Sequence, residues 1–432
     1  MRKSTEIVQH LWTTEKKDSE PWYWGYLFQG CVVLGIAPIL LPIIVAQGQG
    51  PAHVGLVVAM FYTGQVISPL IGKLADRTRQ FGLIFLGSFA LLALGLMGFA
   101  LVTDILLWCL FAFIQGAGAG AGNTTAYSYI VEFRPEPEWD ARLGWLQTFY
   151  GTGQAAGLLI AAAIQSQAMV GLWACALLMI PGFLLARIGL PGISRRKSAR
   201  TAAPLTHNVP AMTHARTPAS ILRHYEHLSR PKLKALGAQW WSYFGLFMLS
   251  WFLLMLGTWM VYNLYPLLMK NAFNIPAGLS SLYYGIAALI GIFFYAPSGS
   301  WAVKFGSSKV VFMGIIATLG SISGMAVMLM FGQNVQAWLV PPVFILLPVA
   351  WSPMIVAGTA LTGKLCSGSQ GSAMGLFNAT TAMASVSAAL LAGGIAQKLG
   401  YGAICWTAAI VVGTGLLLFI PVLRYSQIQR TL

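Results

Sequence analysis

Residues 72–82 read Gly72-Lys73-Leu74-Ala75-Asp76-Arg77-Thr78-Arg79-Gln80-Phe81-Gly82 and lie between two long apolar runs, residues 54–71 and 83–102. Each run is close to the roughly 20 residues that a helix needs to cross a bilayer. A charged segment this short between two such runs predicts a tight turn at a membrane surface. The segment also carries Asp76, one of very few carboxylates near an apolar run in this chain. A simpler interpretation is a solvated turn that is basic only because of the positive-inside bias.

The composition indicates that most of the chain lies in lipid. Of its 432 residues, 57% are hydrophobic and 9% are charged, whereas an ordinary soluble domain carries roughly 25% charged residues. Backbone in hydrocarbon must find its hydrogen bonds internally, which leaves helices or closed barrels, and continuous apolar runs exclude the alternating pattern of a barrel. The sequence therefore predicts an all-α integral membrane protein with twelve spans, at residues 24–46, 53–71, 83–102, 105–133, 143–165, 169–190, 239–269, 279–303, 310–331, 337–362, 372–397 and 401–423.

The placement of the basic residues predicts the orientation. The net charge of +15 would suggest nucleic-acid binding in a soluble protein. If the amino end is cytoplasmic, however, all 26 Lys and Arg except Lys270 and Lys398 fall on the inner side or at inner helix ends, as the positive-inside rule requires. We therefore expect cytoplasmic termini, a bacterial inner membrane and no nucleic-acid partner.

A weaker copy of the first motif follows the eighth span. In residues 299–309, Gly299 matches Gly72, Ala302 matches Ala75 and Lys304 matches Arg77, while Val303 replaces Asp76. A decayed copy at the equivalent place indicates a duplicated six-helix unit. The predicted division is a cytoplasmic tail (1–20), a six-helix bundle (21–192), a cytoplasmic linker with a short amphipathic helix (193–236), a second six-helix bundle (237–424) and a tail (425–432).

The first motif resembles the loop between helices 2 and 3 of the major facilitator superfamily, which reads roughly G-x-L-A-D-R-x-G-R-R. The residues assigned to this pattern are Gly72, Leu74, Ala75, Asp76, Arg77 and Arg79, and Thr78 departs from its form. The resemblance implies two pseudo-symmetric six-helix bundles that rock about a central site, which is alternating access. It also implies a gating role for Gly72, Asp76, Arg77 and Arg79. The Asp76 carboxylate would lie at the amino terminus of the eleventh span, where the helix dipole favours an anion, and would latch the outward-open state.

Two positions depart from the superfamily's drug/proton exchangers. Many of these antiporters carry an Arg three residues before the Gln-Gly of the fourth span, and Ala112 stands there in this chain. The Gly-Pro of their signature in the fifth span appears here as Gly153-Gln154. No Asp or Glu follows Glu226, although proton-coupled transporters normally need a titratable group in the cavity. The sequence is therefore unlike a typical proton-coupled exchanger.

Polar and aromatic side chains inside the spans are the candidate substrate ligands, because such groups are costly in lipid and usually face a cavity. Hydrogen bonding between helices, or anchoring of tyrosines at the interface, is the simpler alternative for each of them. The candidates are Gln29, Asn123, Tyr127, Gln147, Tyr150, Gln154, Tyr262, Asn263, Tyr265, Tyr284 and Asn378. A site of amides and aromatic rings without fixed charge suits a small uncharged or amphipathic organic solute.

The sequence thus predicts a secondary transporter, monomeric, that exports such a solute. A facilitator or importer without proton coupling is the alternative, and a transporter-like receptor or scaffold is the candidate from a different class. An enzyme is not expected, because no cluster of catalytic carboxylates, histidines or an activated nucleophile is present. The five cysteines have no metal-ligand spacing, so neither a metal nor a cofactor is expected.

Overall fold

The computed structural model describes residues 20–133, 139–190, 242–331, 333–365 and 370–431, and all regular secondary structure within them is helical. Eleven stretches are long and apolar enough to cross a membrane. The longest of these, Trp145–Gly189, holds two helices joined by a short turn, Gln165–Gln167. The prediction of an all-α membrane protein with twelve spans is therefore confirmed. Residues 1–19 of the predicted amino-terminal tail and the amphipathic helix of the linker lie outside the described residues.

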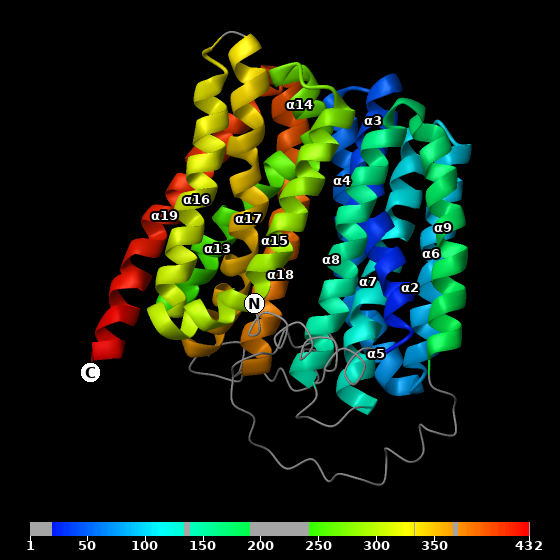
Figure 1. Cartoon of the computed structure of the whole chain (residues 1–432), viewed down its shortest axis with the longest axis horizontal. Helices are drawn as coiled ribbons and strands as arrows, with labels where there is room; N and C mark the ends of the chain where they lie inside the picture. Colours follow the sequence, from blue (N-terminus) through cyan, green and yellow to red (C-terminus); the bar gives the residue numbers. More distant parts are fainter. Residues whose placement is uncertain (1–19, 134–138, 191–241, 332, 366–369, 432) are drawn as a thin grey trace, which may run out of the picture.

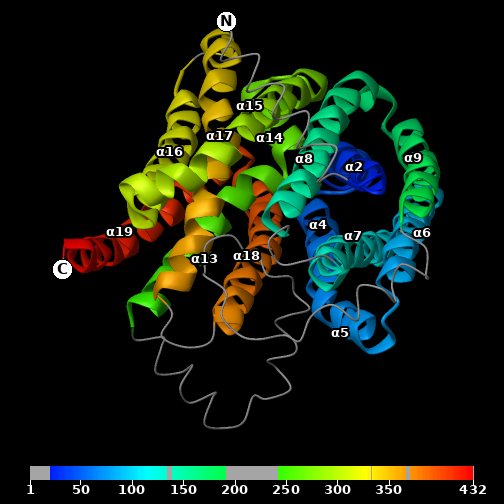
Figure 2. The same cartoon turned by 60° about the horizontal axis from the view of Figure 1, so that its bottom comes forward.

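The helices form two bundles that stand side by side (Figures 1 and 2). The first consists of α2 (Tyr23–Gly30), η1 (Cys31–Ile36), α3 (Ala37–Gly48), α4 (Pro51–Val66), α5 (Ser68–Thr78), α6 (Phe81–Leu101), α7 (Ile105–Phe133), α8 (Trp139–Ile164), η3 (Gln165–Gln167) and α9 (Ala168–Gly189). The second consists of α13 (Tyr243–Asn263), α14 (Tyr265–Phe273), α15 (Ala277–Phe305), α16 (Ser307–Met328), α17 (Gln333–Leu365), α18 (Gln370–Leu399) and α19 (Gly402–Thr431).

The charged motif is mostly helical, which corrects the expectation of a loop over residues 72–82. Residues 68–78 form α5, which begins at Ser68 after a break in the second span at Ile67 and carries a proline in its first turn. The reversal itself takes only two residues, Arg79 and Gln80, before α6 begins. Counted from Gly72, the pattern has its variable position at Thr78 and its glycine at Arg79, so the assignment of Arg79 as a matching residue was wrong. Arg79 adopts a left-handed conformation with φ 58°. The position therefore needs the backbone geometry that glycine adopts most easily.

The second half reverses direction at the equivalent position, although the backbone conformation there differs, with ψ 135° at Gly306 against 22° at Arg79. Superposing Gly299 on Gly72 brings Gly306 onto Arg79, and Gly306 also has a positive φ, 95°. α15 ends at Phe305 and α16 begins at Ser307, as α5 and α6 flank their own turn. The decayed motif therefore retains the backbone reversal of the first, even though its charges differ. We call the end of the bundles that carries these two turns the motif end, and the opposite end the far end.

Prolines interrupt the first span of each half. In the first half, Pro38 has no N–H to donate to the carbonyl of Leu34, and the preceding residues form the π-helical segment η1. In the second half, Pro266 lies in the first turn of α14, and the span breaks at Leu264 between α13 and α14. Both spans differ in this respect from the continuous helices expected from the sequence. The broken ends α3 and α14 pack against one another at the far end.

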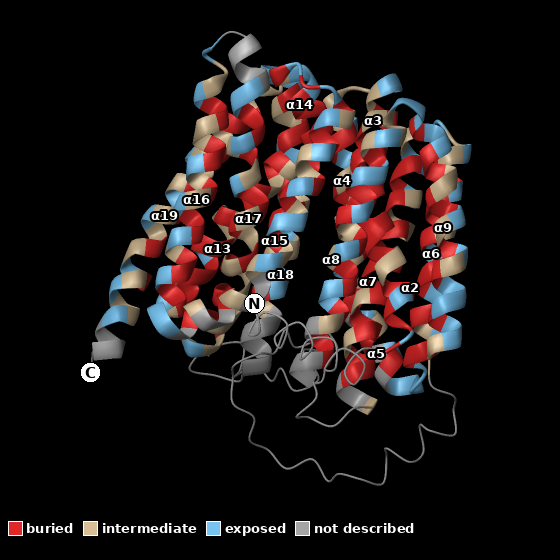
Figure 3. Ribbon diagram, viewed as in Figure 1, coloured by how far each residue is buried: buried red, intermediate tan, exposed pale blue. Residues whose placement is uncertain are grey.

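Glycines allow close packing inside the first bundle. A Cβ added at Gly116 of α7 would lie 1.8 Å from the carbonyl oxygen of Phe61, and one at Gly64 of α4 would lie 2.2 Å from that of Phe113. Small residues permit such backbone contact between membrane helices. Large apolar side chains are exposed on the outer surfaces of both bundles, whereas buried residues fill their interiors (Figure 3). This is the arrangement expected of helices surrounded by lipid.

Besides the contact of α3 with α14, the two bundles meet mainly through two helix pairs, α4 with α18 and α8 with α15. At the far end, the backbone N–H of Ala52 in α4 donates to Gln397 Oε1 in α18 at 3.2 Å. On the other side, a Cβ added at Gly278 of α15 would lie 2.9 Å from the carbonyl oxygen of Ala162 in α8. The far ends of the two bundles are therefore packed together in this structure.

Candidate functional site

The first bundle contributes a cluster of hydroxyl and amide groups from three helices. The Tyr26 hydroxyl of α2 donates to Asn123 Oδ1 of α7 at 2.7 Å, and the Tyr26 ring lies 4.6 Å from the ring of Tyr150 in α8, centroid to centroid. Asn123 is also within hydrogen-bonding reach of the Tyr150 hydroxyl, and Tyr127 is within reach of Tyr26. The structure thus brings together three residues predicted for the site, Asn123, Tyr127 and Tyr150, around Tyr26.

Gln29 lies apart from this cluster. Its Nε2 donates to Ser88 Oγ of α6 at 2.6 Å, and Ser88 in turn donates to the carbonyl oxygen of Phe85. A Cβ added at Gly122 of α7 would lie 2.2 Å from Gln29 Oε1, so glycine at this position makes room for the amide. Gln29 is buried and joins α2 to α6 within the bundle, as the simpler alternative of interhelical hydrogen bonding describes.

The second bundle contributes a cluster of aromatic rings. The Tyr262 ring of α13 lies 5.4 Å from Tyr284 of α15 and 5.7 Å from Trp259. Trp351 of α17 lies 6.2 Å from Trp259. Tyr265 stacks on Phe344 of α17 at 4.3 Å, and its hydroxyl donates to the carbonyl oxygen of Ser280 at 2.8 Å. Three predicted residues, Tyr262, Tyr265 and Tyr284, therefore belong to one cluster.

One tyrosine joins the two clusters. Tyr62 of α4 places its ring 5.4 Å from the ring of Trp259, with an interplanar angle of 62°. The Tyr62 side chain also lies near Tyr150 of the first bundle and Tyr284 of the second. We call the contact between Tyr62 and Trp259 the aromatic bridge. It is a contact between the two bundles that lies within their spans.

Two buried polar atoms beside the bridge lack a hydrogen-bond partner among the described residues. They are Nε1 of Trp259 and Oδ1 of Asn263, both on α13. The Asn263 amide nitrogen, in contrast, donates to the carbonyl oxygen of Ser385 in α18 at 3.2 Å. Buried polar groups are nearly always paired in proteins, so these two enclosed atoms are exceptions among the described residues. A partner could reach them only after the surrounding rings move apart.

The remaining predicted residues are distributed more widely. Gln147 and Asn378 are exposed and Gln154 is half-buried. Of the predicted gating residues, Gly72 is buried in α5, whereas Arg77 and Arg79 are exposed. The side chain of Asp76 lies outside the described part of the structure, so the proposed contact with the start of α18 stays a prediction.

Several members of the two clusters were not predicted from the sequence, namely Tyr26, Tyr62, Trp259, Phe344 and Trp351. Trp259 precedes the predicted Tyr262 by three residues and therefore shares its helix face, which is a signal that the sequence contained. Tyr26 likewise precedes Gln29 by three residues. Nothing in the sequence around Tyr62 or Trp351 distinguishes them from aromatic residues that pack in the core.

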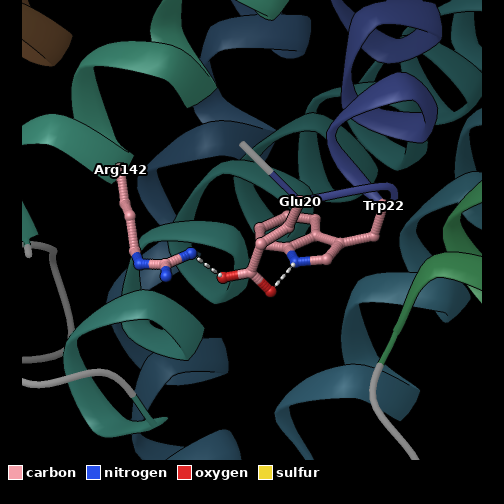
Figure 4. A network of polar contacts seen from close by, with 3 residues as sticks. All are labelled: Glu20, Trp22 and Arg142. Atoms are coloured by element: carbon pink, nitrogen blue, oxygen red, sulfur yellow. Dashed lines mark hydrogen bonds and ion pairs between the residues drawn. The ribbon is translucent and has the colours of Figure 1, made fainter. Parts of the chain in front are cut away.

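Charged side chains are located away from the clusters in the part of the chain that the structure describes. Asp104 caps the start of α7 by accepting from the backbone N–H of Leu106 at 2.9 Å. Glu20 accepts from Arg142 Nη1 at 2.8 Å and from the Trp22 indole N–H at 3.0 Å, at the motif end (Figure 4). No group of three or more potential metal ligands occurs among the described residues. The arrangement at the clusters suits recognition by stacking and hydrogen bonding rather than by ionic contacts or metal chemistry.

Known structures share the fold. A crystal structure of the nucleoside transporter NupG matches 93% of this chain and 98% of its own length, with a TM-score of 0.68 and 13% sequence identity. A crystal structure of a D-xylose-proton symporter matches 93% of this chain and 95% of its own, with a TM-score of 0.66 and 14% identity. At such identities the likeness concerns the fold alone. No curated protein sequence matches the chain.

The sequence itself also matches a family. The model of the Major Facilitator Superfamily matches residues 23–362 and, in a second alignment, residues 252–430. The two matches together extend over nearly all the helices of both bundles. The chain therefore belongs to the Major Facilitator Superfamily, is a membrane transporter by family and fold, and is not an enzyme.

Proposed function

We propose that this transporter moves a small uncharged or amphipathic organic solute, which binds between the two bundles at the aromatic bridge. The observation that carries this proposal is the bridge itself. Tyr62 of the first bundle and Trp259 of the second are in ring contact, and the indole N–H of Trp259 has no hydrogen-bond partner among the described residues. A solute held between Tyr62 and Trp259 would contact both bundles at once. Solute binding would therefore be coupled to their relative movement.

Alternating access is supported by the contacts at the far end. α3 packs against α14, and α4 and α8 pack against α18 and α15, so a solute at the bridge would have to pass between these packed helices to reach the far end. Release toward the far end requires that these helix pairs separate. Rigid-body rocking of one bundle against the other is the movement that achieves this in transporters built from repeats.

The proposed solute carries no net charge, because the clusters contain tyrosines, tryptophans and amides without an ionised side chain. A charged solute inside a membrane protein would need a partner of opposite charge. The second bundle holds no Asp or Glu at all. Proton coupling through that bundle is therefore not part of the proposal, and solute movement would follow the solute's own gradient or use carboxylates of the first bundle.

The experiment is solute flux in vesicles reconstituted with the purified protein, measured with and without a pH gradient. Radiolabelled uridine, D-xylose and uracil serve as neutral solutes, and citrate serves as an anion. We expect flux of at least one neutral solute that Tyr62→Ala strongly reduces, no flux of citrate, and little effect of the pH gradient. Citrate flux, or neutral flux that is unaffected by Tyr62→Ala, would refute the proposal. Vesicles of defined orientation measure the direction, for which export remains the prediction.

A further inference from the structure

Trp259 and Asn263 present two unpaired groups of opposite kind on one face of α13. They are four residues apart, which places their side chains one above the other on a helix. Trp259 Nε1 is a hydrogen-bond donor and Asn263 Oδ1 is an acceptor, and both atoms are buried without a partner among the described residues. Asn263 as a whole is 4% exposed.

The contact with Ser385 determines which polar atom of the Asn263 amide is left unpaired. Its Nδ2 donates to the carbonyl oxygen of Ser385 at 3.2 Å. Turning the amide over would set Oδ1 against that carbonyl oxygen, which is also an acceptor, and would remove the hydrogen bond. Oδ1 is therefore the atom left to accept from a ligand.

The surroundings of this pair are aromatic. The rings of Tyr62, Tyr262 and Trp351 lie 5.4, 5.7 and 6.2 Å from that of Trp259. Aromatic rings pack favourably against flat rings in stacked or edge-to-face arrangements. The neighbouring Tyr265 hydroxyl is already paired with Ser280, and the Tyr26 hydroxyl with Asn123.

These features discriminate between solute classes. A sugar brings several hydroxyl groups, each of which needs a partner when buried, and the unpaired atoms on the described part of α13 are one donor and one acceptor. A flat heterocycle with a lactam edge has one C=O and one adjacent N–H to satisfy, and its faces are apolar enough to stack. The unpaired donor and the unpaired acceptor match the two groups of a lactam edge, and the surrounding rings match its flat faces.

We propose that the transported solute contains a flat, uncharged ring with a lactam edge, whose C=O accepts from Trp259 Nε1 and whose N–H donates to Asn263 Oδ1. The inference rests on the proposed function, because it concerns the same site and names the chemical class of its solute. It assigns Trp259 and Asn263 as the residues that determine specificity. Tyr62, Tyr262 and Trp351 supply the stacking surfaces around them.

Binding of three probes to the purified full-length protein tests this assignment, by calorimetry or by tryptophan fluorescence. Uracil has the lactam edge, 1,3-dimethyluracil has the same ring and carbonyls without an N–H, and D-xylose is a polyol. We expect uracil to bind at least about 10-fold more tightly than dimethyluracil, as the loss of one buried hydrogen bond implies. D-xylose should bind more weakly than uracil.

Two matched tryptophan variants test whether the indole N–H of Trp259 contributes to the affinity for uracil. Trp259→Phe keeps an aromatic ring but removes the indole N–H together with part of the ring area, and the lost hydrogen bond should weaken uracil binding about 10-fold. Trp251→Phe on the same helix is the control, because its indole N–H already donates to Thr381 Oγ1 at 2.9 Å, and it should leave uracil binding unchanged. Asn263→Leu should bring the affinities of uracil and dimethyluracil close together, and thermal unfolding checks that this variant is folded.

Several outcomes would overturn the inference. Equal affinity for uracil and dimethyluracil in the unaltered protein would exclude the lactam edge, as would uracil binding that Trp259→Phe leaves unchanged. Binding of D-xylose without uracil would replace the heterocycle with a polyol, and the proposed transport of a neutral solute at the bridge would still stand. Absence of binding by all three probes would also reject the inference, while the flux experiment with Tyr62→Ala decides the proposed function separately.

Discussion

Gly55 of α4 and Gly393 of α18 are in backbone contact across the two bundles. A Cβ added at Gly55 would lie 2.9 Å from the Cα of Gly393 and 2.4 Å from the carbonyl oxygen of Ala389. A Cβ added at Gly393 would lie 2.7 Å from the carbonyl oxygen of Pro51. Because the atoms on both sides are backbone, no side chain can move aside to admit a larger residue. Closure of the far end therefore depends on these two glycines.

Gly393→Val should hold the far end open. Overpacking costs about 1–3 kcal/mol, which shifts a two-state equilibrium by a factor of about 5–150. We expect faster labelling of a cysteine introduced at Ala52 by a membrane-impermeant maleimide, and the described native cysteines give little background because they are buried. Gly394→Val on the same helix is the control, since a Cβ there would meet nothing within 4 Å. Equal labelling of the two variants would contradict this account of closure.

Gln29 should affect stability more than solute binding. Ser88→Ala leaves the buried Gln29 amide without its partner Ser88 Oγ, and an unsatisfied buried group costs about 1–3 kcal/mol. Adding Gln29→Leu removes the unpaired amide as well, so the double variant should recover part of the lost thermal stability. Thermal unfolding of the two variants measures this recovery. If Gln29→Leu instead abolishes solute binding in a stable protein, the original prediction of a ligand role is correct.

Asp76→Asn should slow transport without lowering stability. The predicted latch between Asp76 and the start of α18 acts when the motif end is closed, whereas this structure has the far end closed. Removing the charge should therefore destabilise the state in which the motif end is closed. The thermal unfolding of the state seen here, in which the far end is closed, should stay unchanged. Flux in reconstituted vesicles, compared with thermal unfolding of the same protein, tests the prediction. Unchanged flux would remove Asp76 from the gating residues.

The twelve spans, the all-helical fold and the family could all be predicted from the sequence, because lipid restricts spanning segments to a few patterns that composition reveals. The duplication was also readable from Gly72 and Gly299, and the positive φ of Arg79 and Gly306 supports it. The breaks at Ile67 and Leu264 were not predicted, although Pro69 and Pro266 signalled them. A proline in an apolar run is compatible with a kink, a π segment or a break, and packing decides between these.

The candidate site was harder to predict. A polar residue in a span costs energy unless it is paired, but the sequence does not say whether its partner is a solute or another helix. Gln29 is hydrogen-bonded to Ser88 of another helix, whereas the Asn263 amide is paired through only one of its two polar atoms. The contact between Tyr62 and Trp259 depends on how α4 and α13 are rotated in their separate bundles. No local pattern encodes that rotation.

The buried ion pair at the motif end should stabilise the first bundle. Glu20 precedes α2 and Arg142 lies near the start of α8, 122 residues later in the chain, so the pair fastens α2 to α8. Removing one partner of a buried pair costs about 3–5 kcal/mol, because the remaining charge stays buried, whereas replacing both partners is often close to neutral.

Arg142→Met alone should therefore lower the unfolding temperature sharply, and Glu20→Gln together with Arg142→Met should restore much of the loss. Glutamine is chosen because its carbonyl oxygen can still accept from the indole N–H of Trp22, which Glu20 Oε2 pairs at 3.0 Å. Thermal unfolding of the two single variants and the double variant completes the cycle and yields the coupling energy. Additive losses of unfolding temperature in the double variant would show that the two charges do not stabilise one another. The link between α2 and α8 would then depend on aromatic packing around Trp22. Its ring lies 5.3 Å from that of Phe85 and 5.6 Å from that of Tyr129.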